Sequence, residues 1–153
     1  MLSLKRALVA ACVAGSILFV PTAVFAGTSS GQGAQKQALV DKPVSYCNGL
    51  AGGTVTDHSF ATLNLDGAGN VTTVVHLQKV NPNDTYYVWT YGEGCYPYLY
   101  DGTITTNGQG NGNLSTLWSN PGITAGYVFI YDTAYADSLP NADWLQSPVV
   151  PLR

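Results

Sequence analysis

Aromatic side chains are the most concentrated chemically useful groups in this sequence. They gather around Cys95 and recur toward the C-terminus, as Trp89, Tyr91, Tyr96, Tyr98, Tyr100, Trp118, Tyr127, Tyr131, Tyr135 and Trp144. Flat rings on a rigid β surface can stack on sugar rings, while neighbouring amides and hydroxyls bond the sugar hydroxyls. Such rings also serve as core and cross-strand packing in small β proteins, so the composition alone leaves both uses open.

The segment Tyr96-Pro-Tyr98-Leu-Tyr100 is the part of this set that we expect to be exposed. Its tyrosines alternate, so their side chains share one side of an extended segment. The segment follows a glycine-rich loop that contains Glu93, the only glutamate. We therefore predict a ligand face made of Tyr96, Tyr98, Tyr100 and Glu93, for a cell-wall glycan or another component of the cell envelope.

Histidines and carboxylates give little support for a metal ion. His58 and His76 are the only histidines, and we expect them on one polar strand face, within about 7–8 Å of each other. A metal site needs a third and a fourth ligand, which no nearby cysteine or carboxylate supplies. Two turns carry oxygen-bearing side chains, but without the acidic spacing of a calcium loop: Asp66, Asn70, Asp101, Asn107 and Asn111. We expect no metal and no cofactor.

No catalytic motif is recognisable, and we predict that the protein is not an enzyme. A glycosidase pair would need Glu93 with an aspartate such as Asp101, or two aspartates. The sequence has no Gly-x-Ser-x-Gly elbow and no serine or cysteine signature beside a histidine. A secreted hydrolase stays as the alternative, because catalytic groups can be assembled from distant residues.

The N-terminal sequence is typical of a secretory signal peptide. Lys5 and Arg6 precede an apolar run over residues 7–25, and Val24-Phe25-Ala26 presents small residues where a signal peptidase cleaves. We predict cleavage after Ala26, and hence a protein that is secreted or attached to the cell wall.

Two other uses of the apolar run are weaker. As an uncleaved anchor it is barely as long as the ~20 residues that a spanning helix needs, and Pro21 interrupts it. As a lipoprotein signal, Val9-Ala-Ala-Cys12 resembles a cleavage box, but it leaves an apolar region shorter than the roughly 7–15 residues expected.

The mature chain would be a single acidic domain of 153 − 26 = 127 residues. It has nine Asp and Glu residues and four basic residues, which gives a net charge of 4 − 9 = −5. The basic residues are Lys36, Lys42, Lys79 and Arg153. Because no basic patch exists, binding to nucleic acid and to an anionic membrane surface is excluded. The abundance of Thr, Val, Tyr, Gly and Asn favours strands and tight turns over helices.

Two cysteines stay in the mature chain once Cys12 is removed. We expect Cys47 and Cys95 to pair in a disulfide, since an exported protein is in an oxidising compartment. Closing so long a loop would stabilise the fold by roughly 3–4 kcal/mol in the chain-entropy model. A redox-active pair is the alternative, but it lacks a C-x-x-C spacing.

A repeat organises the middle of the chain. The segment Ala61–Asn70 has a counterpart at Gly102–Asn111, an offset of 102 − 61 = 41 residues. The same offset relates Leu77 to Trp118 and Tyr86 to Tyr127, which suggests one supersecondary unit used twice, over 61–91 and 102–132. We expect each unit to form a three-stranded meander.

The first unit predicts a hairpin closed by Asp66-Gly-Ala-Gly-Asn70. This turn pairs Leu65 with Val71 and places an apolar face inward, made of Ala61, Leu63, Leu65, Val71, Thr73, Val75 and Leu77. The outward face is mainly polar and comprises His58, Phe60, Thr62, Asn64, Thr72, Val74, His76 and Gln78. The equivalent inward positions of the second unit are Ile104, Leu114 and Trp118.

The strands that follow each hairpin, 85–91 and 126–132, are apolar on both faces and should be central. A first strand is expected at 39–46, where Pro43 restricts it to an edge, and a last one at 147–152 after an irregular stretch over 137–144. The total of seven or eight antiparallel strands suits a two-sheet sandwich over 39–153, after a flexible segment 27–38.

The stretch from Ala61 to Trp89 resembles the extracellular β-sandwich segment of bacterial membrane-anchored anti-sigma factors. The likeness rests on Ala-Thr-Leu-Asn-Leu-Asp-Gly-Ala-Gly-Asn-Val and on Asn-Pro-Asn-Asp-Thr-Tyr-Tyr-Val-Trp, about a fifth of the chain. It implies an immunoglobulin-like (Ig-like) sandwich. The zinc-binding segment and internal membrane helix of that family have no counterpart here, so sigma-factor control is not implied. The chain also resembles small secreted β proteins of Gram-positive bacteria.

We therefore expect a secreted or envelope-associated, non-catalytic β-sandwich with a binding or structural role. A carbohydrate-binding module is the first alternative, and an exposed row of aromatic rings would distinguish it. A hydrolase is the second, and a cleft in which Glu93 or several aspartates converge with shifted pKa values would distinguish it.

Overall fold

The computed structural model describes residues 33–43, 47, 50–138 and 142–152. They form one antiparallel sheet of nine strands, in the order β5-β4-β7-β8-β1-β2-β3-β6, with β9 beside β7. The strands are β1 (Gln35–Asp41), β2 (Thr54–Leu65), β3 (Val71–Leu77), β4 (Thr85–Gly92), β5 (Tyr98–Thr105), β6 (Gly112–Trp118), β7 (Ala125–Asp132), β8 (Trp144–Gln146) and β9 (Val150–Pro151). Two short helical turns, η1 (Glu93–Cys95) and α1 (Thr133–Ala136), complete the set. The predicted signal peptide lies outside the described residues.

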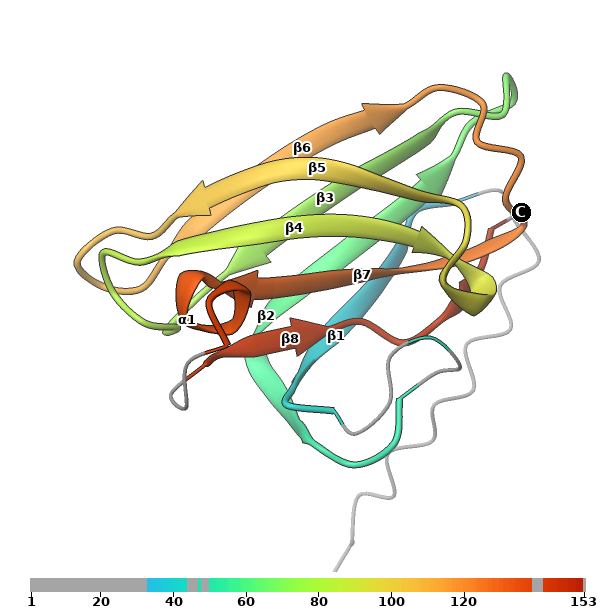
Figure 1. Ribbon diagram of the computed structural model, residues 1–153. Coiled ribbons are helices and arrows are strands. Elements are labelled where there is room, and N and C mark those ends of the chain that lie inside the picture. Colours follow the sequence, from blue (N-terminus) through green and yellow to red (C-terminus); the bar gives the residue numbers. More distant parts are fainter. Residues whose placement is uncertain (1–32, 44–46, 48–49, 139–141, 153) are drawn as a thin grey trace, which may run out of the picture.

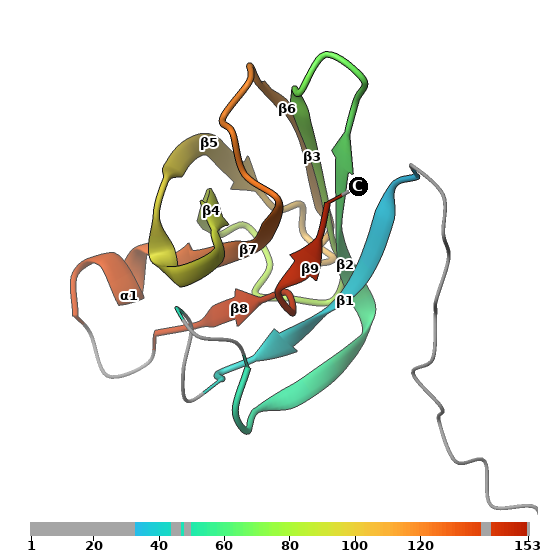
Figure 2. The ribbon, with the colours of Figure 1, turned by 90° about the vertical axis from the view of Figure 1, so that its right-hand side faces the viewer.

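The sheet curls into a flattened, nearly barrel-shaped body of two layers. Strands β5, β4, β7 and β8 lie in front in Figure 1, with β1, β2, β3 and β6 behind them. The layers join where β8 pairs with β1, at Val40–Gln146 and Asp41–Leu145. On the other side β5 and β6 are the two ends of the sheet, and Figure 2 shows the space between them. We call this line, where no ladder joins the two described strands, the seam.

The hairpin predicted for the first unit is confirmed in register and in facing. Strand β2 pairs with β3 through Leu65–Val71, Leu63–Thr73 and Ala61–Val75. The inward residues are buried or packed against the core, whereas those of the outward face are exposed or half-buried. Alternation and turn chemistry together therefore determined this register.

Two turns of the same geometry stand 41 positions apart. In the first, Asp66 Oδ1 accepts the backbone N–H groups of Ala68 and Asn70, and Gly69 has a φ of 84°. In the second, Asn107 Oδ1 accepts those of Gln109 and Asn111, and Gly110 has a φ of 73°. In each turn the glycine supplies a left-handed backbone that other residues adopt only with strain.

The predicted meanders are wrong. Strand β4 does not continue the β2–β3 hairpin but pairs with β5 and β7, and β5 pairs with β4 rather than with β6. Two of the three strand pairs related by the 41-residue offset are neighbours instead, since β3 pairs with β6 and β4 with β7, whereas β2 and β5 lie in different layers. Val74 faces Ser115, its own equivalent at that offset. Because β4 and β7 each have a strand on both sides, their backbone N–H and C=O groups are paired along both edges.

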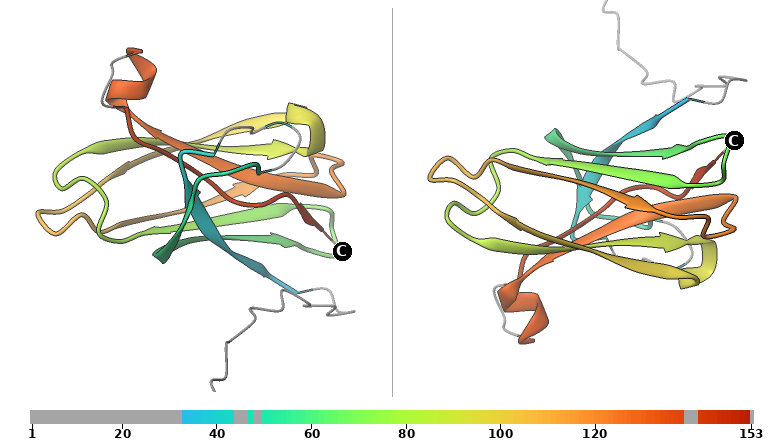
Figure 3. Two further views of the ribbon diagram at one scale, coloured as in Figure 1. Left: turned by 90° about the horizontal axis from the view of Figure 1, so that it is seen from below. Right: turned by 90° about the horizontal axis from the view of Figure 1, so that it is seen from above.

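One core fills the space between the two layers. It comprises Leu39, Ala61, Leu63, Val71, Val75, Leu77, Tyr86, Val88, Ile104, Ile123, Val128, Ile130, Leu145, Val150 and Leu152. Strands β4 and β7 are central, as predicted, and they contribute Tyr86, Val88, Val128 and Ile130 to it. Figure 3 shows the two layers from below and from above, with α1 standing outside them.

The chain ends differ from the prediction. Strand β1 begins at Gln35, inside the segment expected to be flexible, and stops at Asp41 before Pro43. It is an inner strand between β8 and β2, because the proline follows it and removes no ladder donor. The strand expected at 147–152 is reduced to β9, and β8 was not predicted.

Candidate functional site

The outer surface of the front layer is covered by aromatic rings. Strand β4 turns Tyr86, Val88 and Thr90 into the core, so Tyr87, Trp89 and Tyr91 point outward. We call the whole outward set the aromatic face, and its members are Tyr87, Trp89, Tyr91, Tyr96, Tyr98, Tyr100, Tyr127, Phe129, Tyr131, Tyr135 and Trp144. It belongs to the layer that faces the viewer in Figure 1.

Pairing between β4 and β7 brings rings of the two strands together. Tyr91 is paired with Tyr127, and their rings are stacked at 5.3 Å with planes 11° apart. Tyr87 is paired with Tyr131 at 5.4 Å. Tyr127 and the neighbouring Phe129 are buried, and they form the floor on which the outer rings lie. Such contacts stabilise the face before any ligand arrives.

The rings of β5 and of the preceding Tyr96 are exposed, and those of β5 lie beside the outward rings of β4. Trp89 sits between Tyr98 and Tyr100, with ring centroids 5.9 Å and 4.9 Å away. Tyr96 makes an edge contact with Tyr98 at 6.4 Å. The exposed fractions of Tyr96, Tyr98 and Tyr100 are 77%, 55% and 44%. The expected exposure of these three tyrosines is thus confirmed, and Trp89 unites them.

A β-bulge makes this arrangement compatible with the core. Val88 pairs with Gly102, whereas the next residue, Trp89, pairs with Tyr100, so Asp101 is an extra residue in β5. Strict alternation would place Tyr98 and Tyr100 on the same side as Ile104, which is buried. The extra residue switches the side of the strand, so that the tyrosines face solvent and Ile104 faces the core.

Asp101 itself points inward and connects four strands. It accepts hydrogen bonds from the hydroxyls of Thr90 on β4 (2.6 Å) and Thr116 on β6. The Thr90 hydroxyl is also 2.7 Å from that of Thr73 on β3. Burial raises the pKa of the Asp101 carboxyl, while the two threonine hydrogen bonds act to lower it. This threonine–aspartate chain crosses the seam beneath the aromatic face.

Glu93 lies in η1, at the end of the aromatic face where Tyr96 is found. The two residues line a hollow of about 240 Å³ together with Pro97, Gly122, Ile123, Thr124 and Ala125. The disulfide between Cys47 and Cys95 holds this end, with Cα atoms 4.9 Å apart, and confirms the predicted pairing. Cys95 Sγ is also 3.1 Å from the Tyr127 hydroxyl.

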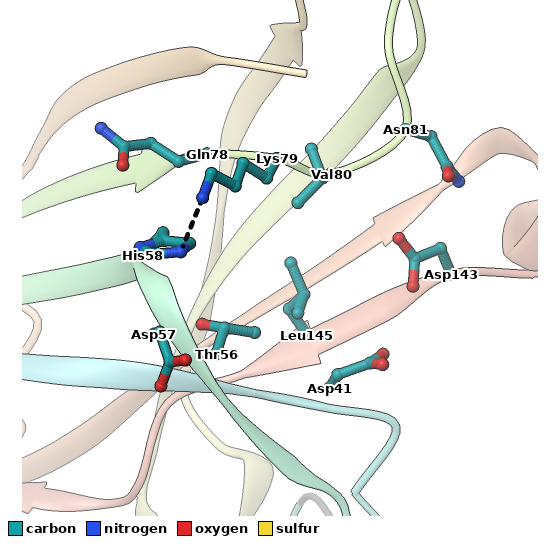
Figure 4. Close-up of a pocket in the computed structure, with 10 residues that line it drawn as sticks. All are labelled: Asp41, Thr56, Asp57, His58, Gln78, Lys79, Val80, Asn81, Asp143 and Leu145. Carbon is teal, nitrogen blue, oxygen red and sulfur yellow. Dashed lines mark hydrogen bonds between the residues drawn. The ribbon is translucent and has the colours of Figure 1, made fainter. Parts of the chain in front are cut away.

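A second hollow, of about 280 Å³, opens at one end of the barrel, and Figure 4 shows its lining residues. Asp41, Asp57 and Asp143 are among them. Asp143 accepts a hydrogen bond from the buried Tyr86 hydroxyl at 3.0 Å. Burial, together with the charge of Asp41, raises the pKa of Asp143 although the Tyr86 hydrogen bond lowers it. Sequence reasoning did not find this convergence of carboxylates.

Each of the two histidines lies beside a polar side chain. His58 Nε2 lies 3.0 Å from the Lys79 ammonium, and His76 Nε2 lies 2.8 Å from the Gln78 amide. Among the described residues, no group of three or more His, Cys, Asp or Glu side chains is placed to hold a metal ion. In the two turns considered for calcium, Asp66 and Asn107 accept backbone N–H groups.

Sequence reasoning named most rings of the aromatic face but did not place them. Tyr87 and Phe129 were not included, because the strands expected at 85–91 and 126–132 are apolar on both faces and neither face could be assigned to the core. Trp118 was included, yet it packs against the core from β6. Asp101, considered with Glu93 as a glycosidase pair, points into the barrel, whereas Glu93 lies exposed in η1. The structure therefore does not bring these two carboxylates together in one hollow.

The chain matches no protein-family model, no curated protein and no solved structure. Among the residues that the structure describes, none belongs to a helix long and apolar enough to cross a membrane.

Proposed function

We propose that this protein is a non-catalytic carbohydrate-binding module of the cell exterior, and that sugar rings bind on its aromatic face. The observation that supports this proposal is the exposure of Tyr96, Tyr98 and Tyr100 in a set of packed rings. Exposed aromatic patches of this kind on small proteins mark interaction surfaces. An exposed row of aromatic rings is the feature expected to distinguish such a module from a purely structural sandwich.

The chemistry of the face suits a sugar. Each tyrosine combines an apolar ring, which packs against the C–H groups of a pyranose, with a hydroxyl that bonds a sugar hydroxyl. Thr103 and Thr105 are exposed on the same strand and add hydroxyls beside Tyr87 and Thr85, their partners on β4. The rings are already in mutual contact, so little side-chain entropy is lost when a ligand binds.

The proposal includes export, with the signal peptide cleaved after Ala26. The Cys47–Cys95 disulfide is compatible with an extracellular location. We also propose a relationship to Ig-like sandwiches. In support, the Tyr86 hydroxyl accepts the backbone N–H of Asn81 upstream of its strand, much as the tyrosine corner of those sandwiches bonds back to the chain.

The test is a pull-down of the purified protein with insoluble cell walls and with insoluble polysaccharides. The Tyr96→Ala/Tyr98→Ala variant removes two exposed rings, and Tyr96→Phe/Tyr98→Phe keeps the rings as a matched control. We expect retention of the wild type on at least one polymer, at least ten-fold weaker retention of the alanine variant, and retention of the phenylalanine variant. Thermal unfolding of each variant verifies that it is folded. If the wild type is retained by no polymer, the proposal is wrong and a structural role is favoured.

A hydrolase is the second candidate, because Asp41 and Asp143 line the same hollow, shown in Figure 4, and the pKa of Asp143 is raised. Incubation with each polysaccharide, followed by an assay for new reducing ends, tests it. Release of reducing ends by the wild type and their loss in Asp41→Asn would favour the hydrolase. Intact polymer would leave the binding module as the function.

A further inference from the structure

The charge around the aromatic face restricts which carbohydrate it can take. Each lysine that the structure describes is engaged elsewhere. Lys36 Nζ lies 3.8 Å from the centroid of the Phe60 ring, on the outer side of the rear layer. Lys79 is hydrogen-bonded to His58, and the charge of Lys42 acts on Asp143. At the end of the tyrosine row, the exposed carboxylate of Glu93 lines the same hollow as Tyr96.

A face of this kind cannot neutralise an anionic polymer. Uronic acids, sulfated sugars and phosphate-bearing polymers are bound in proteins by Arg and Lys, which supply charge-assisted hydrogen bonds. Here such a polymer would meet aromatic rings, a carboxylate and a molecule of net negative charge. Like charges brought together at an interface oppose binding.

The length of the row of rings indicates how many sugar units of a ligand can contact the aromatic face. Rings continue without a break from Tyr96 through Tyr98 to Trp89 and Tyr100. They continue from Tyr100 to Tyr87 (6.5 Å) and from Tyr87 to Tyr131 (5.4 Å). Alternate residues of a strand are about 7 Å apart, so the exposed rings extend over more than one sugar unit. In the part of the chain that the structure describes, the exposed tyrosine row runs along the outer side of β5 and β4, and such an open strand surface accommodates the interior of a polymer chain.

Resting on the proposed function, we infer that the ligand is a linear, uncharged polysaccharide bound along the interior of its chain. Affinity then comes from stacking on several rings and not from ion pairs. It rises with the number of sugar units until the row is covered, and it changes little with salt, because no charge is neutralised.

Affinity electrophoresis of the purified protein tests the inference. Native gels contain hydroxyethylcellulose, linear mannan or amylose as uncharged polymers, or polygalacturonate as the anionic one. We expect retardation by at least one uncharged polymer and no retardation by polygalacturonate. The retardation should be the same at low salt and in 0.5 M NaCl, although the Debye length falls from roughly 30 Å at 0.01 M to roughly 4 Å. We further expect that the six-unit oligosaccharide of the retained polymer competes at least ten-fold better than its disaccharide.

The outcomes separate the two proposals. Retardation by polygalacturonate equal to that by an uncharged polymer would overturn this inference and leave carbohydrate binding intact. Equal competition by disaccharide and hexasaccharide would also overturn it, since binding would then involve a single sugar. Retardation by no polymer at all would overturn carbohydrate binding itself. Glu93→Lys provides a matched variant, because it should gain retardation by polygalacturonate and keep retardation by the uncharged polymer.

Discussion

At the scale of single residues, Asp101 has two structural roles, one in the direction of its neighbours' side chains and one in the hydrogen bonds of the interior. As the bulged residue it lets Tyr98 and Tyr100 face solvent, and its carboxylate bonds Thr90 and Thr116 inside the barrel. A carboxylate in such a place is desolvated, so its protonated form is favoured relative to an exposed aspartate.

The raised pKa of Asp101 predicts how stability changes with pH. Above the ordinary pKa of 3.8, the Asp101 carboxyl is deprotonated in the unfolded chain but still protonated in the folded protein. The contribution of Asp101 to the free energy of unfolding is therefore present at low pH and is lost as pH rises through the folded pKa. Asp101→Asn should remove that loss, so its stability relative to wild type should improve between pH 3 and pH 7. Urea unfolding at pH 3, 5 and 7 measures this difference.

Asp66 is the matched control because its pKa is shifted the other way. Hydrogen bonds from Asn70 lower it, so its contribution is present above 3.8 and is lost as pH falls through the folded pKa. Asp66→Asn should therefore lose stability relative to wild type as pH rises from 2 to 4. If both variants showed the same trend, the assignment for Asp101 would be contradicted.

At the scale of elements, the two related turns differ in what surrounds their glycines. A Cβ on Gly110 would lie 2.0 Å from the Val80 carbonyl oxygen, whereas one on the equivalent Gly69 would lie 2.9 Å from a side-chain oxygen of Asn120. Gly67, at a different position of the first turn, has nothing within 4 Å. Gly110 also has a φ of 73°. The turn between β5 and β6 is thus packed against the chain that leaves β3.

Replacement of these glycines should show the difference. We expect Gly110→Ala to destabilise the protein by at least about 2 kcal/mol, from backbone strain and overpacking together. Gly67→Ala should change stability by no more than about 0.5 kcal/mol. Chemical denaturation of both variants measures the two values, and equal values would mean that the turn is not packed as described.

Elements whose pairing is determined by adjacent sequence could be predicted. Elements whose pairing depends on strands distant in sequence could not. The β2–β3 hairpin followed from alternation and from the turn at Asp66, both of which are local. Strand β8 has three residues and exists because it bridges β7 and β1, a condition that no local pattern records. The destination of β4 was missed for the same reason, since a strand apolar on both faces accepts any two neighbours.

The candidate site was predictable to the same extent. The alternation of Tyr96, Tyr98 and Tyr100 indicated a shared, exposed side, which the structure confirms. The outward direction of Trp89 could not be predicted, because Val88 and Trp89 are both apolar. The bulge at Asp101 is a single extra residue, and its only local signal is the following glycine, whose φ is 130°.

At the scale of the whole molecule, the barrel is closed on one side only. Strands β8 and β1 join the layers through backbone pairing, whereas at the seam the described strands are joined by the Asp101–Thr116 hydrogen bond. Strand β5 therefore has one paired edge and one edge without a ladder.

Hydrogen exchange should reveal this asymmetry. In β5 the amides directed at β4 should exchange slowly and the alternate ones, directed at the seam, at least about ten-fold faster. In β4, which has a strand on each side, no such alternation is expected. Exchange resolved by residue in NMR spectra measures both patterns. Uniform protection along β5 would contradict the open seam.

The placement of the lysines gives the molecule two chemically distinct sides. Lys36 and Lys79 lie against Phe60 and His58 on the rear layer, and the exposed phenols lie on the front layer. A reagent that reacts with those two amines would attach to a solid support from behind and leave the aromatic rings facing the solution. A reagent that reacts with phenols would do the reverse. The orientation of the protein on a sensor surface is thus set by the choice of coupling chemistry.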